Sequence, residues 1–145
     1  MTDIGLRSTV EQADLIRRGE ISSRELTTHF IERIERLDDE INAVVTRDFE
    51  TALAESDAAD ASQQKGQSLG VLHGVPVTVK DALQTKNLKS TGGATELREN
   101  IPSQDAAAVA SIRREGAIVM GKTNLPRWSG DIQAYNDIFG TTNNP

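Results

Sequence analysis

The amino-acid sequence predicts an α/β fold in which an N-terminal helical layer precedes a strand–helix–strand unit. Two helix-capping sequences, each followed by apolar residues at helical spacing, open the first half of the chain. Alternating valines around residue 77 are typical of a β-strand, and a helical segment and a short apolar run follow them. We expect the two strands of this unit to be parallel, with a right-handed crossover.

The first half of the chain contains three predicted helices. A serine three residues before a glutamate forms a capping box twice, at Ser8-Thr9-Val10-Glu11 and at Ser22-Ser23-Arg24-Glu25. Gly19 is a natural stop for the first helix. The second helix carries an apolar stripe at the spacing of one helix face, made of Leu26, Phe30, Ile34, Leu37 and Ile41. An alanine-rich third helix is expected over residues 48–61, and the polar run 62–68 is expected to be a surface linker.

The second half of the chain carries the predicted strands. The first runs from Val75 to Lys80, and Pro76 should lie at its start because proline cannot donate to a ladder. A loop that contains Ser90-Thr91-Gly92-Gly93 follows. A helix is expected over about 105–115, capped by Ser103 or Gln104 and ended by Gly116, before a short buried strand over residues 117–120.

Composition excludes several classes of function. The 145 residues include no cysteine and two histidines, so thiol catalysis is excluded, and neither a metal site nor a cofactor is expected. The net charge of −6 and the five aromatic residues argue against direct nucleic-acid binding. No apolar run approaches the length of a membrane span, and the start of the chain, MTDIGLRSTV, lacks the apolar core of a secretory signal. We therefore expect a cytoplasmic protein without membrane contact.

The charge divides the chain into two parts. Residues 1–66 have a net charge of −7, whereas residues 67–145 have a net charge of +1. We expect residues 1–66 to form a solvated helical layer and residues 67–145 to form the α/β core of the same domain.

The sequence GAIVMGKT at residues 116–123 matches the phosphate-binding pattern GxxxxGK[ST]. Such a loop needs a strand before its first glycine and a helix that begins at the Lys-Thr pair. Here a predicted helix precedes Gly116, and the four middle residues are themselves a predicted strand. We therefore reject nucleotide binding and expect a strand end and turn, with Lys122 in a structural role near the rim.

Lys80 is the strongest candidate for chemistry. It ends the first predicted strand, and ligands of open α/β sheets gather at the carboxyl ends of strands. Strand alternation places Lys80 on the face of Thr78, opposite Asp81, so Asp81 is not an obvious partner for it. On spacing alone, a surface lysine that ends a strand is the favoured interpretation, and a buried base is the alternative.

Four segments, in order along the chain, change the favoured interpretation of Lys80 to that of a base. They are GVLHGVPVTVKD at residues 70–81, DAAAV at 105–109, GAIVMGKTN at 116–124 and FGTTNNP at 139–145. Together with Ser90-Thr91-Gly92-Gly93, this series resembles the amidase signature family over nearly the whole chain. The resemblance implies an α/β/α fold and hydrolysis of carbon–nitrogen bonds of small amides by a Ser–cis-Ser–Lys triad, in which Lys80 takes the place of the lysine.

The chain departs from the family in two respects. It contains no GGSSGGS-like run, so the resemblance assigns neither catalytic serine, and Ser90, Ser103, Ser111 and Ser129 lie in other contexts. Both serines and the oxyanion donors are expected beyond Pro145, which makes the chain resemble a truncated N-terminal piece that is inactive alone. Arg127 also stands where the family commonly has an acidic residue, which implies a different pocket wall.

Other candidate residues have structural interpretations. His73 has no serine, carboxylate or second histidine beside it in sequence, and His29 is expected to be solvated on its helix. Trp128 and Tyr135 are expected to pack locally, and a pocket role for Gly92 and Gly93 rests on the resemblance. Two further functions stay open: the glutaminase subunit of a tRNA-dependent amidotransferase, and a catalytically inactive fragment.

Overall fold

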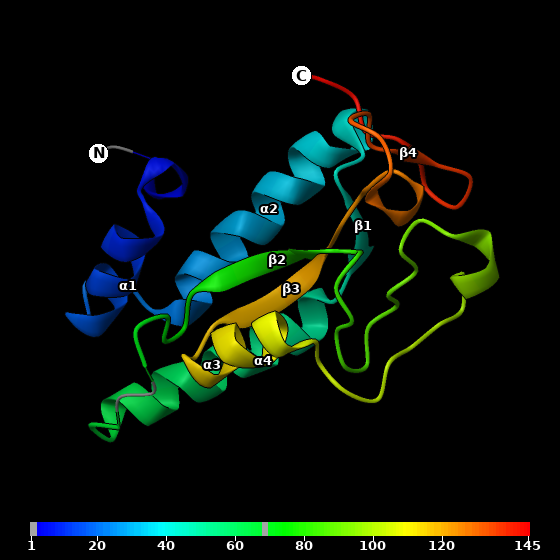
Figure 1. The fold of residues 1–145 in the computed structure, drawn as a ribbon. Coiled ribbons are helices and arrows are strands. Elements are labelled where there is room, and N and C mark those ends of the chain that lie inside the picture. Colours follow the sequence, from blue (N-terminus) through cyan, green and yellow to red (C-terminus); the bar gives the residue numbers. More distant parts are fainter. Residues whose placement is uncertain (1–2, 68–69) are drawn as a thin grey trace.

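The computed structural model describes residues 3–67 and 70–145 (Figure 1). Its helices are α1 (Thr9–Arg17), α2 (Ser23–Ile41), α3 (Phe49–Gln64) and α4 (Ala107–Arg114). Its strands are β1 (Val44–Arg47), β2 (Pro76–Lys80), β3 (Ile118–Thr123), β4 (Tyr135–Asn136) and β5 (Gly140–Thr141). Short 3-10 helices cover Ile4–Leu6, Thr95–Leu97 and Arg127–Ser129. No helix in these described ranges combines the length and the hydropathy that a bilayer span requires.

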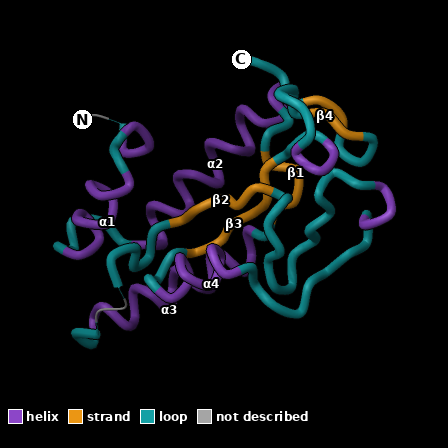
Figure 2. The backbone as a smooth tube through the Cα atoms, viewed as in Figure 1, coloured by secondary structure: helices purple, strands orange, loops and turns teal. Residues whose placement is uncertain are grey.

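The sheet has the strand order β1-β3-β2, so that within the described ranges β2 forms one edge. β2 and β3 are parallel, as expected for the strand–helix–strand unit, and β1 is antiparallel to β3. The long connection between β2 and α4 leaves the sheet at the carboxyl end of β2 and makes a wide excursion before it returns (Figures 1 and 2). That end of the sheet is therefore where loops gather.

Helices cover both faces of the sheet. Ile118 and Met120 of β3 are buried against α2 and α3, with Ile31 and Ala52 in the same cluster. On the opposite face, three valines from β2, β3 and α4 form a second cluster, Val79, Val119 and Val109. The fold is therefore the α/β fold that the sequence predicts, in the three layers that the family resemblance implies.

The first helices begin where the capping boxes predict. Ser8 and Ser22 each accept a hydrogen bond from the backbone of the glutamate three residues on, and each glutamate returns one. Gly19 follows the end of α1 with a φ of 68°, a conformation that glycine adopts readily. Only part of the predicted α2 stripe is confirmed, because Leu26 is buried but Leu37 is 39% exposed.

Several local predictions were wrong. Residues 62–64 of the expected linker belong to α3, whereas Ser68 lies outside the described residues. The N-cap of α4 is Ala106, without a side-chain bond, instead of Ser103 or Gln104. Residues 1–66 also contribute a strand, β1, to the sheet and are not wholly helical. The division at residue 66 stays a prediction.

Gly121 explains why the phosphate-binding pattern cannot form a cradle. It lies inside β3, which continues through Lys122 to Thr123. A Cβ at position 121 would lie 2.5 Å from the Thr46 carbonyl oxygen of β1, so glycine permits the two strands to approach. The pattern is therefore a buried strand, longer than residues 117–120.

We expect Gly121→Ala to reduce the free energy of unfolding by about 1–3 kcal/mol, because the added methyl group must push β1 away from β3. Urea titration followed by circular dichroism measures this loss. Gly130→Ala is the matched control, since Gly130 has a φ of −86° and a Cβ there would lie 3.3 Å from the Arg127 carbonyl oxygen. Equal stability losses in the two variants would contradict the prediction.

Candidate active site at the carboxyl end of β2

Lys80 is the last residue of β2, at the end of the sheet where the loops gather. Its side chain is exposed and shares a strand face with exposed Thr78, whereas Val79 and Asp81 are buried on the other face. The predicted alternation is therefore confirmed. In the described part of the chain Lys80 is not the buried lysine of the alternative interpretation, because no element there covers its side chain.

A buried polar cluster lies on the opposite face of β2, directly behind Lys80. Its members are Asp81, Ser90, Thr91 and Lys122, none of which is more than 5% exposed. Three of them come from the loop that follows β2, and Lys122 comes from the neighbouring parallel strand. The cluster thus joins the strand that ends in Lys80 to the loop that leaves it.

The Asp81 carboxylate is held by one residue of that loop. The Thr91 amide nitrogen lies 3.1 Å from each carboxylate oxygen, and the Thr91 hydroxyl donates to Oδ2. Gly92 donates its backbone N–H to the Asp81 carbonyl oxygen at 3.2 Å. Both the side chain and the main chain of Asp81 therefore bind the small-residue segment 90–93.

Lys122 is fully buried, which corrects its expected place near the rim. Its Nζ donates to the Leu83 carbonyl oxygen and to Ser90 Oγ, both at 2.7 Å, and lies 3.7 Å from Asp81 Oδ1. Burial lowers the pKa of the Lys122 ammonium to about 8, while the Asp81 carboxylate acts in the opposite direction. The group is thus mainly charged at neutral pH and is compensated by the carboxylate.

Ser90 and Lys122 form a serine–lysine contact, yet the geometry does not make Ser90 a nucleophile. Ser90 Oγ accepts from the Thr85 backbone N–H at 3.1 Å as well as from Lys122, and it lies 3.2 Å from the Leu88 carbonyl oxygen, to which it donates. Both lone pairs and the proton are therefore engaged. An attacking hydroxyl needs a free lone pair, so this contact is a structural one.

A cavity of 230 Å³ opens beside the cluster and is lined in part by Asp81, Ser90 and Gly92. Trp128 and Ser129 form another part of its wall, and both have a positive φ, 54° and 57°. Such backbone conformations are costly for residues with side chains and concentrate at ligand sites. Trp128, expected to pack locally, is 55% exposed at this wall.

Arg127, at the start of the same 3-10 helix, forms an exposed ion pair with Glu96 at 2.7 Å. This pair links the wall of the cavity to the loop between β2 and α4. The basic side chain therefore has an acidic partner from the loop.

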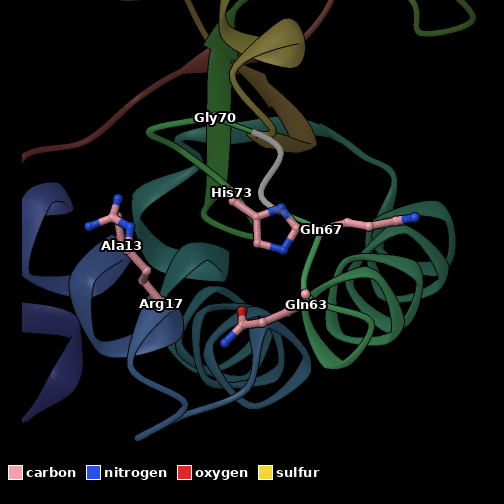
Figure 3. A pocket seen from close by; sticks show the side chains of 7 residues that line it. Ala13, Arg17, Gln63, Gln67, Gly70 and His73 are labelled. Atoms are coloured by element: carbon pink, nitrogen blue, oxygen red, sulfur yellow. The ribbon is translucent and has the colours of Figure 1, made fainter.

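A second cavity, of 190 Å³, lies at the opposite end of β2, around His73 (Figure 3). Arg17 of α1 and Gln63 of α3 contribute to its lining; in Figure 3 the Gln63 side chain lies below the imidazole, and the Arg17 side chain extends away from it. His73 Nε2 lies 3.1 Å from the Ala59 carbonyl oxygen. This contact supports the structural role expected for His73, far along the strand from Lys80.

Among residues 3–67 and 70–145, no three acidic or histidine side chains gather as the ligands of a metal ion would. His29, expected to be solvated, is half-buried: its Nε2 lies 3.2 Å from the Asp3 carboxylate, and its ring is edge-on to Phe30.

The sequence did not reveal the buried Asp81–Lys122 pair. One signal was available: strand alternation places Asp81 on the face of the valines, and a buried carboxylate requires a partner. Lys122 was not recognised as that partner because the predicted strand ended at Met120. Lys122 faces inward only because β3 continues to Thr123.

Lys122 makes the stability of the chain dependent on pH. Its pKa is about 8 in the folded chain, below the 10.5 of an unperturbed lysine, so the unfolded chain holds more protons between these values. Unfolding free energy should therefore rise by about 2–3 kcal/mol between about pH 7 and pH 10, relative to Lys122→Met. Urea titrations across this range measure the difference. A lysine Cε resonance that titrates near pH 8 would support the assignment, and titration of all lysines near pH 10 would contradict it.

Comparisons with known proteins agree with this architecture. A family model described as Amidase matches residues 25–145. The A subunit of glutamyl-tRNA(Gln) amidotransferase from Salinispora arenicola is 39% identical over 145 residues, which is all of this chain and 30% of that protein. The protein of the same name from Moorella thermoacetica is 38% identical over 135 residues, which is 93% of this chain and 28% of that protein.

Solved structures of amidases also share this fold. Native peptide amidase from Stenotrophomonas maltophilia has a TM-score of 0.88 and 30% identity, over 97% of this chain and 30% of that one. Fatty acid amide hydrolase has a TM-score of 0.90 and 26% identity, over 96% of this chain and 25% of that one. The chain thus spans less than a third of the curated relatives that it matches. The family match and the shared α/β fold together establish that this chain belongs to the amidase signature family.

Proposed function

We propose that this chain supplies the lysine base of an amide-hydrolysing site, with Lys80 in that role. The observation that supports the proposal is the position of Lys80 at the carboxyl end of β2, inside the segment 70–81 that resembles the family signature. The substrate class is a small-molecule amide. No cofactor, metal ion or membrane takes part in the proposed reaction.

The proposed reaction is acyl transfer to a serine. Lys80 Nζ takes a proton from a bridging serine, which in turn takes the proton of a second, nucleophilic serine. The second serine oxygen forms a bond to the amide carbon, and backbone N–H groups stabilise the oxyanion. The carbon–nitrogen bond then breaks, the leaving amine receives the proton, and water releases the acyl group.

A lysine can act as such a base only when its amine is neutral. Lowering a lysine pKa from about 10.4 to about 7 costs roughly 4–5 kcal/mol, which burial beside hydroxyl groups can supply. Lys80 is exposed in the described part of the chain, so the proposal requires further sequence to cover it. The two serines must come from the same source, because the 145 residues contain no glycine/serine-rich run.

A more specific function is favoured by one observation. Relatives at 36–39% identity carry the name of the A subunit of glutamyl-tRNA(Gln) amidotransferase, whereas the solved amidases compared above are at 26–30%. In this alternative the amide is that of glutamine, and the released ammonia is passed to a partner protein. We propose a cytoplasmic location in either case, and no direct contact of this chain with nucleic acid.

The role of Lys80 can be tested in a graft in which this chain replaces the corresponding first 30% of the Salinispora arenicola protein. We expect the graft to release ammonia from glutamine and Lys80→Ala to reduce kcat by about 1,000-fold or more, because the serine loses its base. Lys86→Ala is the matched control, since Lys86 is an exposed lysine in the loop after β2.

Circular dichroism and the elution volume of each variant report whether the graft is folded. A folded Lys80→Ala graft that retains more than about a tenth of the parental kcat would show that another group is the base.

The 145-residue chain alone is expected to release no ammonia from glutamine or from a simple aliphatic amide. The reason is that Lys80 is exposed in the described part of the chain, and that Ser90, the serine bound to Lys122, has both lone pairs and its proton engaged. An ammonia assay with purified chain measures this. Steady turnover that Lys80→Ala abolishes would contradict the prediction, whereas a graft without activity would favour a catalytically inactive fragment.

A further inference from the structure

Backbone hydrogen bonds fix the chain on both sides of Lys80, although Lys80 is the exposed last residue of β2. Before it, Val79 and Lys80 are in parallel register with Lys122 and Thr123 of β3. After it, the Asp81 backbone N–H donates to the Thr123 carbonyl oxygen at 3.0 Å, which extends the ladder by one further bond. The Lys80 carbonyl oxygen itself accepts from the Leu83 backbone N–H at 3.0 Å.

The buried cluster prevents rotation at this point of the chain. Turning the peptide unit between Lys80 and Asp81 would withdraw the Asp81 carboxylate from the Thr91 amide and hydroxyl. It would also leave the Lys122 ammonium buried without its counter-charge, and breaking a buried ion pair in this way is strongly unfavourable. Because successive side chains of a strand point to opposite faces, fixing Asp81 inward fixes the direction of Lys80 outward.

Lys122 adds a second connection to the same loop. Its Nζ binds Ser90 Oγ and the Leu83 carbonyl oxygen at the same time, and Ser90 Oγ accepts from the Thr85 backbone N–H. The loop segments around residues 83–85 and 90–92 are therefore bound to one buried ammonium group. That group lies on β3, beside Val79 in the strand register.

We propose that Asp81, Thr91 and Lys122 are positioning residues that fix the direction of Lys80 at the end of β2. The proposal rests on the role of Lys80 proposed above. None of the three contacts the substrate in this scheme: they act through the backbone of residues 80–81. A base that is displaced by about 1 Å loses much of its catalytic effect. These three residues, called the clamp below, therefore contribute to kcat by holding Lys80 in position.

The clamp can be tested first in the 145-residue chain by native-state hydrogen exchange. Asp81→Asn removes the negative charge but keeps the shape of the side chain, and it should accelerate exchange of the Thr91 and Gly92 amides about tenfold or more. Glu99→Gln is the matched control, because Glu99 is an exposed carboxylate of the same loop that pairs with Lys89. Unchanged exchange at Thr91 in Asp81→Asn would overturn the proposal.

The effect on catalysis can be tested in the graft with two substitutions of one residue. Thr91→Val removes the hydroxyl that donates to Asp81, whereas Thr91→Ser keeps it. We expect Thr91→Val to reduce kcat about tenfold per folded molecule with KM within about twofold, and Thr91→Ser to restore kcat to within about twofold of the parent. A residue that only stabilises the fold would change the folded fraction and leave kcat per folded molecule unaltered.

The outcomes separate this proposal from the proposed function. If Lys80→Ala abolishes turnover but Thr91→Val has the parental kcat, Lys80 is the base and the clamp does not position it. If Lys80→Ala leaves turnover intact, the proposed function fails, and the exchange rates of Thr91 and Gly92 still decide whether the clamp exists.

Discussion

A buried charge pair, Asp81 with Lys122, determines how the second half of this chain is arranged. Neither group could be removed from water alone, because an uncompensated charge in a protein interior is far more costly than a lost apolar contact. The pair is therefore possible only if β2 and β3 lie in parallel register and the loop after β2 folds back to supply hydroxyl and amide donors. The observed parallel register and loop path meet that requirement, and the inward direction of Asp81 leaves Lys80 pointing outward.

This constraint also explains the residue types of two signature segments. In residues 116–124, Gly121 lets β1 approach β3, and Lys122 then reaches inward as a buried cation. In residues 90–93, Thr91 supplies two donors to a single carboxylate, while Gly92 and Gly93 adopt positive φ values of 60° and 67° beside Trp128 and Arg127. A segment that matches a phosphate-binding pattern thus has a wholly different physical role.

Elements governed by local chemistry could be predicted from the sequence. The capping boxes, Gly19 and the valine alternation depend on neighbours a few residues apart, and the structure confirms them. The parallel pairing of residues 75–80 with the later strand was predictable from the strand–helix–strand order. β1 could not be predicted, because the strand Val44–Arg47 is short and exists through its pairing with β3. Lys122 was misplaced for the same reason: a lysine after a glycine suggests a turn unless a distant carboxylate compensates it. The position of Lys80 was predictable from strand spacing, whereas its exposure depends on what covers it.

β2, an edge strand in the described sheet, affects the risk of aggregation while the chain is being synthesised. Segments emerge from the ribosome in order, so the parallel pair of β2 and β3 can form while later sequence is still absent. An open strand edge at that stage could pair with another nascent chain and start aggregation, and natural sheets guard such edges with charged residues, especially lysine. Lys80 stands at the exposed end of this strand, where its positive charge can repel such partners.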